Sequence, residues 1–246
     1  SRVIDSINTK GQHAVIYGER GVGKTSLANI LHETLSSIGL KEFIVNKINC
    51  DSTDNFTTVW QKALKSIINI AEISGIGFEP ITKQYVLDLS QGLGEKVVPD
   101  NICNAFIQCR RPIVFIFDEY DRIADSRADE LFADTMKTLS DRHILGTLVL
   151  VGVAEDVDDL IESHESISRS LVQIKLPRMN QDELAGIILK ALNILDMSID
   201  QDACDYIIRI SQGLPHYTHL LGLASTRAAL KREAKKIEIV DVNTAI

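Results

Sequence analysis

The sequence predicts an α/β fold, in which a parallel sheet is flanked by helices, followed by a small all-helical domain. Short apolar segments alternate with segments of helical periodicity as far as Pro177, and only helical segments follow Gln181. A glycine-rich segment joins the first apolar segment to the first long helix. Apolar strands alternating with helices are typical of a parallel sheet covered on both faces. We therefore expect a core over residues 1–177 and a helical domain over residues 178–246.

The order of the elements follows from the same patterns. The apolar segments expected to form strands are residues 13–17, 43–50, 112–117, 147–152 and 171–176. Helical spacing predicts helices over 25–35, 57–71, 127–141, 180–194, 201–212 and 215–236, and one more from about Val240. Residues 73–100 are rich in glycine and proline, and we expect loops around one short helix there.

Length and composition limit the class of protein. The 246 residues, 45% of them hydrophobic, suffice for one large domain or a core with a smaller one. A net charge of −8 disfavours binding of nucleic acid over the whole surface. The four cysteines have no C-x-x-C or zinc spacing, so we expect reduced, mostly buried thiols. No apolar run has transmembrane length and no signal peptide opens the chain, which predicts a cytoplasmic protein without a membrane partner.

The glycine-rich segment carries the first chemical signal. Residues 18–25 read Gly-Glu-Arg-Gly-Val-Gly-Lys-Thr, the pattern G-x-x-x-x-G-K-[ST], between an expected strand and an expected helix. Its glycines allow backbone N–H groups to point at phosphate oxygens, and the following helix start adds attraction. Lys24 is predicted to meet the β- and γ-phosphates and Thr25 to bind Mg²⁺. The alternative is a glycine-rich turn with an incidental lysine.

The residues expected to contact the nucleotide are Gly18, Glu19, Arg20, Gly21, Val22, Gly23, Lys24, Thr25 and Ser26.

A second signal lies where the most apolar strand ends. Residues 113–117 are Ile-Val-Phe-Ile-Phe, and Asp118 and Glu119 follow. Asp118 is predicted to orient Mg²⁺ through water, and Glu119 to orient or polarise an attacking water. An acidic turn that caps a strand is the alternative. The phosphate loop roughly ninety residues upstream favours the catalytic interpretation.

The phosphate loop, the Asp118-Glu119 strand and the helical C-terminal domain together resemble an AAA+ ATPase of the P-loop NTPase superfamily. The resemblance is to the origin-recognition and transposition-helper branches, which border the STAND signalling ATPases. It implies five parallel strands in the order 5-1-4-3-2, a helical lid, and ATP or ADP with Mg²⁺ held at the junction. It also implies a homo-oligomer, in which an arginine from the neighbouring subunit reaches the γ-phosphate.

The resemblance places that arginine just before the last strand, where Arg169 stands in this sequence. A cation at this position stabilises charge on the transferred phosphoryl group when it is supplied in trans. The alternative for Arg169 is a surface arginine or an ion pair with the acidic stretch 155–159. Arg178, just after the strand, is the weaker candidate.

Two positions depart from the family. The strand 147–152 does not end on the polar sensor residue that the family carries. The lid has Gly213-Leu214-Pro215-His216 where a sensor arginine is expected, and this turn resembles the STAND and transposition-helper branches. Pro215 suits the first turn of a helix. In those branches the turn lies over the nucleotide, so Pro215 and His216 are candidate phosphate contacts; packing of His216 between lid and core is the alternative.

Two functions remain open from the sequence. One is Mg²⁺-dependent ATP hydrolysis by an assembly that remodels a protein or DNA partner. The other is a slow nucleotide switch that controls an effector or partner, which the missing sensors favour. A third possibility, a scaffold that binds no nucleotide, would require the loss of Lys24 or Asp118, and both residues are present. We expect both chain ends to be domain boundaries, so a protein or DNA partner would bind through regions outside this chain.

Overall fold

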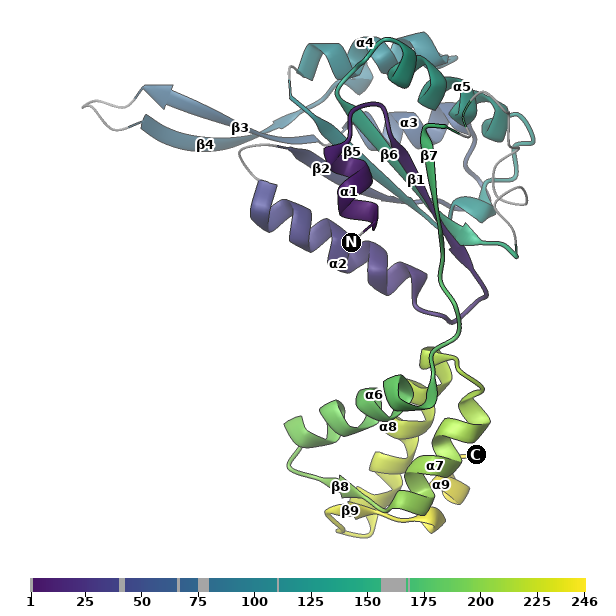
Figure 1. The fold of residues 1–246 in the computed structure, drawn as a ribbon. Coiled ribbons are helices and arrows are strands. Elements are labelled where there is room, and N and C mark those ends of the chain that lie inside the picture. The colour runs from purple at the N-terminus through teal and green to yellow at the C-terminus, as the bar shows by residue number, and fades with distance from the viewer. Residues whose placement is uncertain are drawn as a thin grey trace. The chain divides into compact units, whose positions relative to one another are not determined.

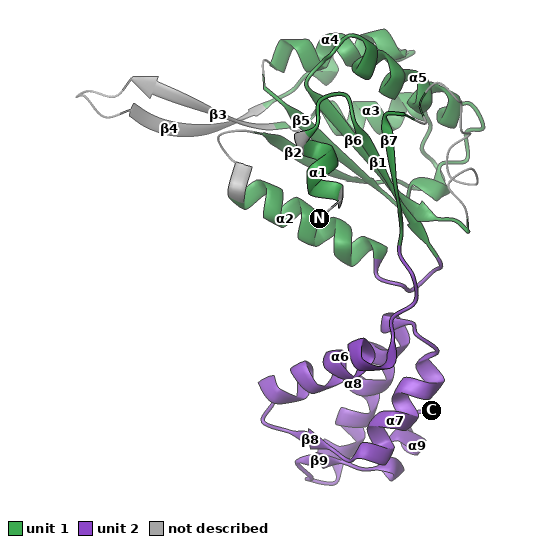
Figure 2. Ribbon diagram, in the orientation of Figure 1, with its two compact units in different colours: residues 1–18, 24–175 green, residues 19–23, 176–246 purple. Residues whose placement is uncertain are grey.

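The chain divides into two compact units, which are coloured separately in Figure 2. The computed structural model describes residues 2–39, 43–65, 67–74, 80–109, 111–155, 167 and 169–246. Unit 1 consists of residues 1–18 and 24–175, and unit 2 of residues 19–23 and 176–246. The middle of the phosphate loop therefore belongs to the compact unit formed by the C-terminal helices.

Unit 1 is built on a five-stranded parallel sheet (Figure 1). Its strands are β1 (His13–Gly18), β2 (Ile44–Asn49), β5 (Ile113–Asp118), β6 (Gly146–Val153) and β7 (Leu171–Lys175). They lie in the order β2-β5-β6-β1-β7, which confirms the predicted order 5-1-4-3-2 when read from β7. The predicted fold class, a P-loop NTPase sheet flanked by helices, is confirmed. Every side chain of β1 and β5 is buried, as the continuous apolar runs predicted.

Helices cover both faces of this sheet (Figure 1). On one face lie α3 (Phe56–Lys65), α4 (Pro99–Cys109) and α5 (Ala128–Asp141), and on the other lie α1 (Arg2–Asn8) and α2 (Lys24–Gly39). Trp60 of α3 is fully buried at the centre of an aromatic cluster. The rings around it are Phe56, Phe106, Phe115, Phe117 and Phe132. All four cysteines are buried and unpaired, in agreement with the expected thiols.

The prediction of a helix over 57–71 is wrong in its second half. Helix α3 ends at Lys65, and the strand β3 (Ile67–Ser74) follows. β3 pairs antiparallel with β4 (Pro80–Leu87), from Ile67↔Leu87 to Ser74↔Pro80. The β-branched residues of this segment suit a strand as well as a helix face, and antiparallel pairing with β4, the next strand in the chain, decides between the two.

The prediction of loops around one short helix in 73–100 is also wrong. The segment contains β4, the 3-10 turn η1 (Ser90–Gly92) and the start of α4 at Pro99. Proline at the first helical position costs no hydrogen bond, so Pro99 marks a helix start rather than a loop. Gly75 and Gly77, which suggested the loop, lie outside the described residues.

Unit 2 contains the four expected helices. They are α6 (Gln181–Ile194), α7 (Gln201–Ser211), α8 (Pro215–Lys231) and α9 (Ile239–Ala245). The expectation of helices alone is corrected by two short strands, β8 (Ser198–Ile199) and β9 (Lys236–Ile237), which pair in parallel. Helix α6 begins with a capping box, in which the Asn180 side chain accepts from Glu183 N and the Glu183 carboxylate accepts from Asn180 N.

Candidate functional site

The two sequence motifs meet in unit 1. Thr25 is the second residue of α2 and Asp118 is the last residue of β5. The Thr25 hydroxyl donates to Asp118 Oδ1 at 3.2 Å, although 93 residues separate the two. Asp118 is buried, and the backbone N–H of Glu119 also donates to its Oδ1, at 3.0 Å. The structure thus places a hydroxyl beside a carboxylate at the carboxyl edge of the sheet.

Lys24 lies at the first position of α2 and is largely buried. Its ammonium donates to the carbonyl oxygen of Gly18 at 2.9 Å, across the start of the loop. Gly18 has a φ of 151° and ends β1, next to the loop. The lysine is therefore held at the base of the loop, where the motif requires it.

Lys47 is a residue of this site that the sequence analysis did not identify. Its ammonium lies 2.9 Å from Asp118 Oδ2 and 2.5 Å from Asn29 Oδ1 of α2. β2 pairs with β5 so that Asn49 lies opposite Asp118, and Lys47 is on the same face two residues earlier. The signal in the sequence is a lysine in the middle of a strand, but its importance depends on β2 lying next to β5.

Glu119 follows Asp118 with left-handed backbone angles, φ 56° and ψ 37°. Its carboxylate accepts from Arg122 Nη1 at 2.7 Å, and both side chains are about half exposed. This hydrogen bond raises the pKa of Arg122. Because an ion pair between exposed side chains is weak, Glu119 can leave Arg122 at little cost. The carboxylate predicted to orient water is therefore paired but exchangeable.

The end of β6 carries no polar side chain at the expected sensor position. Instead, the backbone N–H of Val153 donates to Asp121 Oδ1 at 2.8 Å. Asp121 belongs to the 3-10 turn η2 (Tyr120–Arg122) that follows Glu119. Asp121 thereby ties the turn after the carboxylate strand to the neighbouring strand, which gives it a structural role.

The middle of the phosphate loop is held within unit 2. Arg178 donates through Nε and Nη2 to the carboxylate of Glu19, with Nη2 to Oε2 at 2.6 Å and Nε to Oε2 at 3.0 Å. Arg178 Nη1 also donates to the carbonyl oxygen of Gln212, at 3.1 Å. Arg178, the weaker candidate for an arginine supplied to a neighbour, is thus engaged inside its own chain.

The lid turn also lies against the loop. The backbone N–H of His216 donates to Gly21 O at 3.3 Å. A Cβ atom added to Gly21 would lie 3.5 Å from His216 Cβ, and one added to Gly23 would lie 3.9 Å from Pro215 Cγ. Pro215 and His216, the two candidates from the lid, are therefore next to the loop glycines. Their contact with a phosphate stays a prediction.

Arg169 lies in an exposed turn just before β7. The residue after it, Ser170, accepts a hydrogen bond from His13 N at the start of β1. Arg169 is therefore at the amino edge of the parallel sheet, and Asp118 is at the carboxyl edge. Its role as an arginine supplied to a neighbouring subunit stays a prediction. Of the acidic stretch 155–159, residues 156–159 lie outside the described part of the chain.

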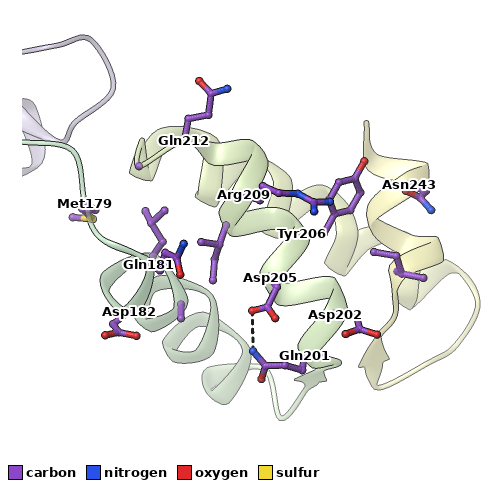
Figure 3. A pocket seen from close by; sticks show the side chains of 15 residues that line it. Met179, Gln181, Asp182, Gln201, Asp202, Asp205, Tyr206, Arg209, Gln212 and Asn243 are labelled. Carbon is purple, nitrogen blue, oxygen red and sulfur yellow. Dashed lines mark hydrogen bonds between the residues drawn. The ribbon is translucent and has the colours of Figure 1, made fainter.

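A pocket of about 1080 Å³ lies between α6, α7 and α9 of unit 2 (Figure 3). Its lining includes Asp182, Asp202 and Asp205, and the guanidinium of Arg209 lies 5.0 Å from the ring centroid of Tyr206. Three carboxylates repel phosphate groups, so this pocket does not suit a nucleotide.

The basic residues after α8 are paired with carboxylates. Arg232 pairs with Asp241 at 2.8 Å, Lys235 with Asp196 at 3.3 Å, and Lys236 with Asp200. Because these cations are paired with carboxylates, the segment after α8 offers little free positive charge for DNA.

Oxygen ligands for a magnesium ion are present beside the phosphate loop. Mg²⁺ is usually held by one or two carboxylates or hydroxyls together with substrate phosphates. Thr25 Oγ1 and Asp118 Oδ1 form such a pair, and Lys47 shows that Asp118 Oδ2 accepts a cation. The described residues contain no group of three His, Cys, Asp or Glu side chains that could hold a metal without a substrate. The residues present therefore fit Mg²⁺ brought with a nucleotide.

Comparison with known proteins agrees with this fold. Five parallel strands in this order, with a glycine-rich loop after β1 and a carboxylate at the end of β5, define a P-loop NTPase. A family model described as "AAA domain" matches residues 7–161, more than half of the chain. The chain belongs to this AAA family.

Two solved structures share the fold. The RuvB Holliday junction branch migration motor of Thermotoga maritima is 19% identical, with a TM-score of 0.58 over 95% of this chain and 60% of that one. The Orc1 protein of Aeropyrum pernix, solved in complex with DNA, is 16% identical, with a TM-score of 0.65 over 99% of this chain and 62% of that one. The chain thus spans about three fifths of the length of either protein. No curated protein matches the sequence.

Within the described residues, no helix is both long and apolar enough to span a membrane.

Proposed function

We propose that this chain binds ATP and hydrolyses it with Mg²⁺ as part of an assembly of identical subunits. The observation that carries the proposal is the hydrogen bond from Thr25 Oγ1 to Asp118 Oδ1, because it joins the phosphate-loop motif to the carboxylate motif. Membership of the AAA family supports it. Residues 18–26 would bind the phosphates, with Lys24 directed at the β- and γ-phosphates.

Each remaining residue then has a role. Thr25 and Asp118 would hold Mg²⁺, which supplies positive charge to the β- and γ-phosphate oxygens when it is bound. Glu119, released from Arg122, would orient the attacking water. Arg169 of one subunit would stabilise the charge on the phosphoryl group bound by its neighbour. Pro215 and His216 would close over the phosphates.

The steady-state ATPase rate tests this proposal when it is measured against protein concentration. The rate per subunit is expected to rise with concentration as assemblies form. Glu119→Gln and Arg169→Ala are each expected to lower it at least about 100-fold, as loss of a water-orienting group or an arginine finger does. Mixing the two variants restores activity if Arg169 acts in trans, because mixed interfaces contain one intact site. A rate in Arg169→Ala equal to that of the wild type would exclude this role.

A second function, a slow nucleotide switch, is favoured by the end of β6. The expected polar sensor is missing there, and the backbone N–H of Val153 already donates to Asp121. In this function ATP or ADP stays bound and sets the state of an effector or partner. Nucleotide that co-purifies with the protein, with negligible turnover at every concentration, would favour the switch over the motor.

The partner is expected to be a protein or DNA. The two similar structures are a Holliday junction branch migration motor and a protein in complex with DNA, which makes DNA a candidate. The net charge of −8 and the paired cations after α8 favour a DNA contact through regions outside this chain.

A further inference from the structure

Asp118 already has a cationic partner from its own chain. Its Oδ1 accepts from Thr25 and from the backbone N–H of Glu119, and its Oδ2 lies 2.9 Å from the ammonium of Lys47. The Asp118 side chain is only 3% exposed and the Lys47 side chain 14%. Each of these three partners is a hydrogen-bond donor, and Lys47 carries a full positive charge.

The charge on Lys47 matters because Asp118 is buried. An ionised carboxylate removed from water is costly unless a cation or several donors compensate it. A divalent ion that binds Asp118 brings its own positive charge into the same space. Two cations at short range repel each other strongly at low dielectric, so Lys47 and a metal ion compete for Asp118.

The structure also offers the displaced lysine a second acceptor. Lys47 Nζ lies 2.5 Å from Asn29 Oδ1, on the exposed face of α2. A small rotation of the flexible lysine side chain would keep this hydrogen bond and give up the one to Asp118. The ammonium can therefore leave the carboxylate without losing all of its partners.

We propose that Lys47 is a built-in counter-cation of the metal site. It neutralises Asp118 when Mg²⁺ is absent, moves toward Asn29 when Mg²⁺ binds, and so sets the Mg²⁺ concentration at which the site fills. The proposal rests on the proposed function, because it takes Asp118 as the carboxylate beside the metal. It assigns Lys47 a positioning role without contact to the substrate.

This competition predicts that removal of the Lys47 charge has opposite effects on binding with and without the metal. Without Mg²⁺, Lys47 shields nucleotide phosphates from Asp118, so Lys47→Met weakens nucleotide binding. With Mg²⁺, the variant lacks the competing charge of Lys47, so the metal binds at lower concentration. A lysine with only a structural role would change both conditions in the same direction.

Binding of the fluorescent nucleotide mant-ADP tests the proposal, measured in EDTA and across a MgCl₂ titration. For Lys47→Met, the ratio of the affinity in Mg²⁺ to that in EDTA is expected to rise about tenfold, the effect of about 1.4 kcal/mol. The half-saturating Mg²⁺ concentration falls. Lys47→Arg keeps the charge and stays near the wild type. Asn29→Ala removes the second acceptor and shifts the half-saturating Mg²⁺ concentration upward.

Lys62→Met is the matched control. Lys62 also pairs with carboxylates in unit 1, at 3.0 Å from Asp51 and 2.7 Å from Asp54, but it does not touch Asp118. Its removal is expected to leave the Mg²⁺-to-EDTA ratio unchanged. The fluorescence of Trp60, the one tryptophan, reports whether unit 1 of each variant is folded.

The outcomes separate this inference from the proposed function. Equal changes in both conditions for Lys47→Met, or an unchanged half-saturating Mg²⁺ concentration, would overturn the inference while the nucleotide site stands. If Lys47→Met does not fold, the Asn29→Ala variant decides. A higher half-saturating Mg²⁺ concentration in this variant supports the inference, and an unchanged concentration refutes it. Absence of mant-ADP binding to the wild type would instead refute the proposed function.

Discussion

Arg178 holds Glu19 of the phosphate loop through two nitrogen atoms, with Nη2 at 2.6 Å and Nε at 3.0 Å from Oε2. Arg178 also binds the carbonyl oxygen of Gln212, so one guanidinium links the loop to the segment that precedes α8. The hydrogen bonds to Glu19, together with its negative charge, raise the pKa of Arg178. The conformation of residues 19–23 is thus supported by residues far along the chain.

We expect Arg178→Ala and Glu19→Ala to loosen the loop with little loss of global stability. Both side chains are about half exposed, and exposed ion pairs contribute little to folding. Hydrogen exchange of the amides of residues 20–23 is expected to become faster in either variant. Because both substitutions break the same contact, the double variant should exchange no faster than the single ones. Additive effects would show that the two residues support the loop independently.

His13 makes unit 1 sensitive to acid. The ring is fully buried. Its Nδ1 accepts a hydrogen bond from Leu148 N at 3.0 Å, and its Nε2 lies 3.0 Å from Met136 O. These two contacts require a neutral ring with the proton on Nε2. Burial lowers the pKa of His13 to about 4 from 6.5. The unfolded chain therefore binds the proton more readily than the folded chain does. The contribution of neutral His13 to the free energy of unfolding is complete above pH 6.5 and is lost as the pH falls toward 4. The expected loss is about 3 kcal/mol.

Urea unfolding at pH 7.5, 6 and 5, followed by Trp60 fluorescence, measures this loss. His13→Gln should flatten the decline between pH 6.5 and 5, while His143→Gln at an exposed histidine should leave it unchanged. An equally steep decline in His13→Gln would assign the acid sensitivity to other groups.

Glycine is required at position 213 both by the backbone conformation there and by the closeness of neighbouring atoms. Its φ is +82°, and an added Cβ would lie 2.8 Å from Arg178 Cβ and 3.1 Å from Met179 O. We expect Gly213→Ala to destabilise unit 2 by about 1–3 kcal/mol, from backbone strain and overpacking. Circular dichroism at 222 nm during thermal unfolding measures this, since unit 2 has no tryptophan.

Gly222 in α8 provides the control. Apart from the backbone of its own helix, no atom lies within 4 Å of its added Cβ. Gly222→Ala is therefore expected to stabilise the helix by about 0.5–1 kcal/mol. Destabilisation by both substitutions would argue against the conformation described for Gly213.

Phe132 links the aromatic cluster to the carboxylate strand. Its ring centroid lies 5.7 Å from that of Trp60, 5.0 Å from Phe117 and 5.0 Å from Tyr120. Phe132→Ala is expected to cost about 3–5 kcal/mol through lost burial and a residual cavity. Equilibrium unfolding by urea measures the change. Ile107→Ala, at a side chain that is 56% exposed, should be nearly neutral.

The elements that could be predicted are those that local pattern specifies. The five strands of the main sheet, the phosphate loop and the starts of α6 and α8 follow from apolar runs, from glycines and from capping residues within a few positions of each element. The β3–β4 hairpin and helix α4 could not be predicted, because the composition of these segments suits more than one conformation. The β8–β9 pair could not be predicted, because its two strands are very short and far apart in the sequence.

The sequence by itself determined which side chains are available for phosphate and metal binding. Gly18 to Thr25 and Asp118-Glu119 predict phosphate and metal ligands by residue type and spacing. Only the tertiary structure decided which other side chains act on them. Strand order places Lys47 against Asp118, and the path of the chain after β7 places Arg178 against Glu19. Such pairs depend on distances in space between segments far apart in sequence, which neither periodicity nor spacing encodes.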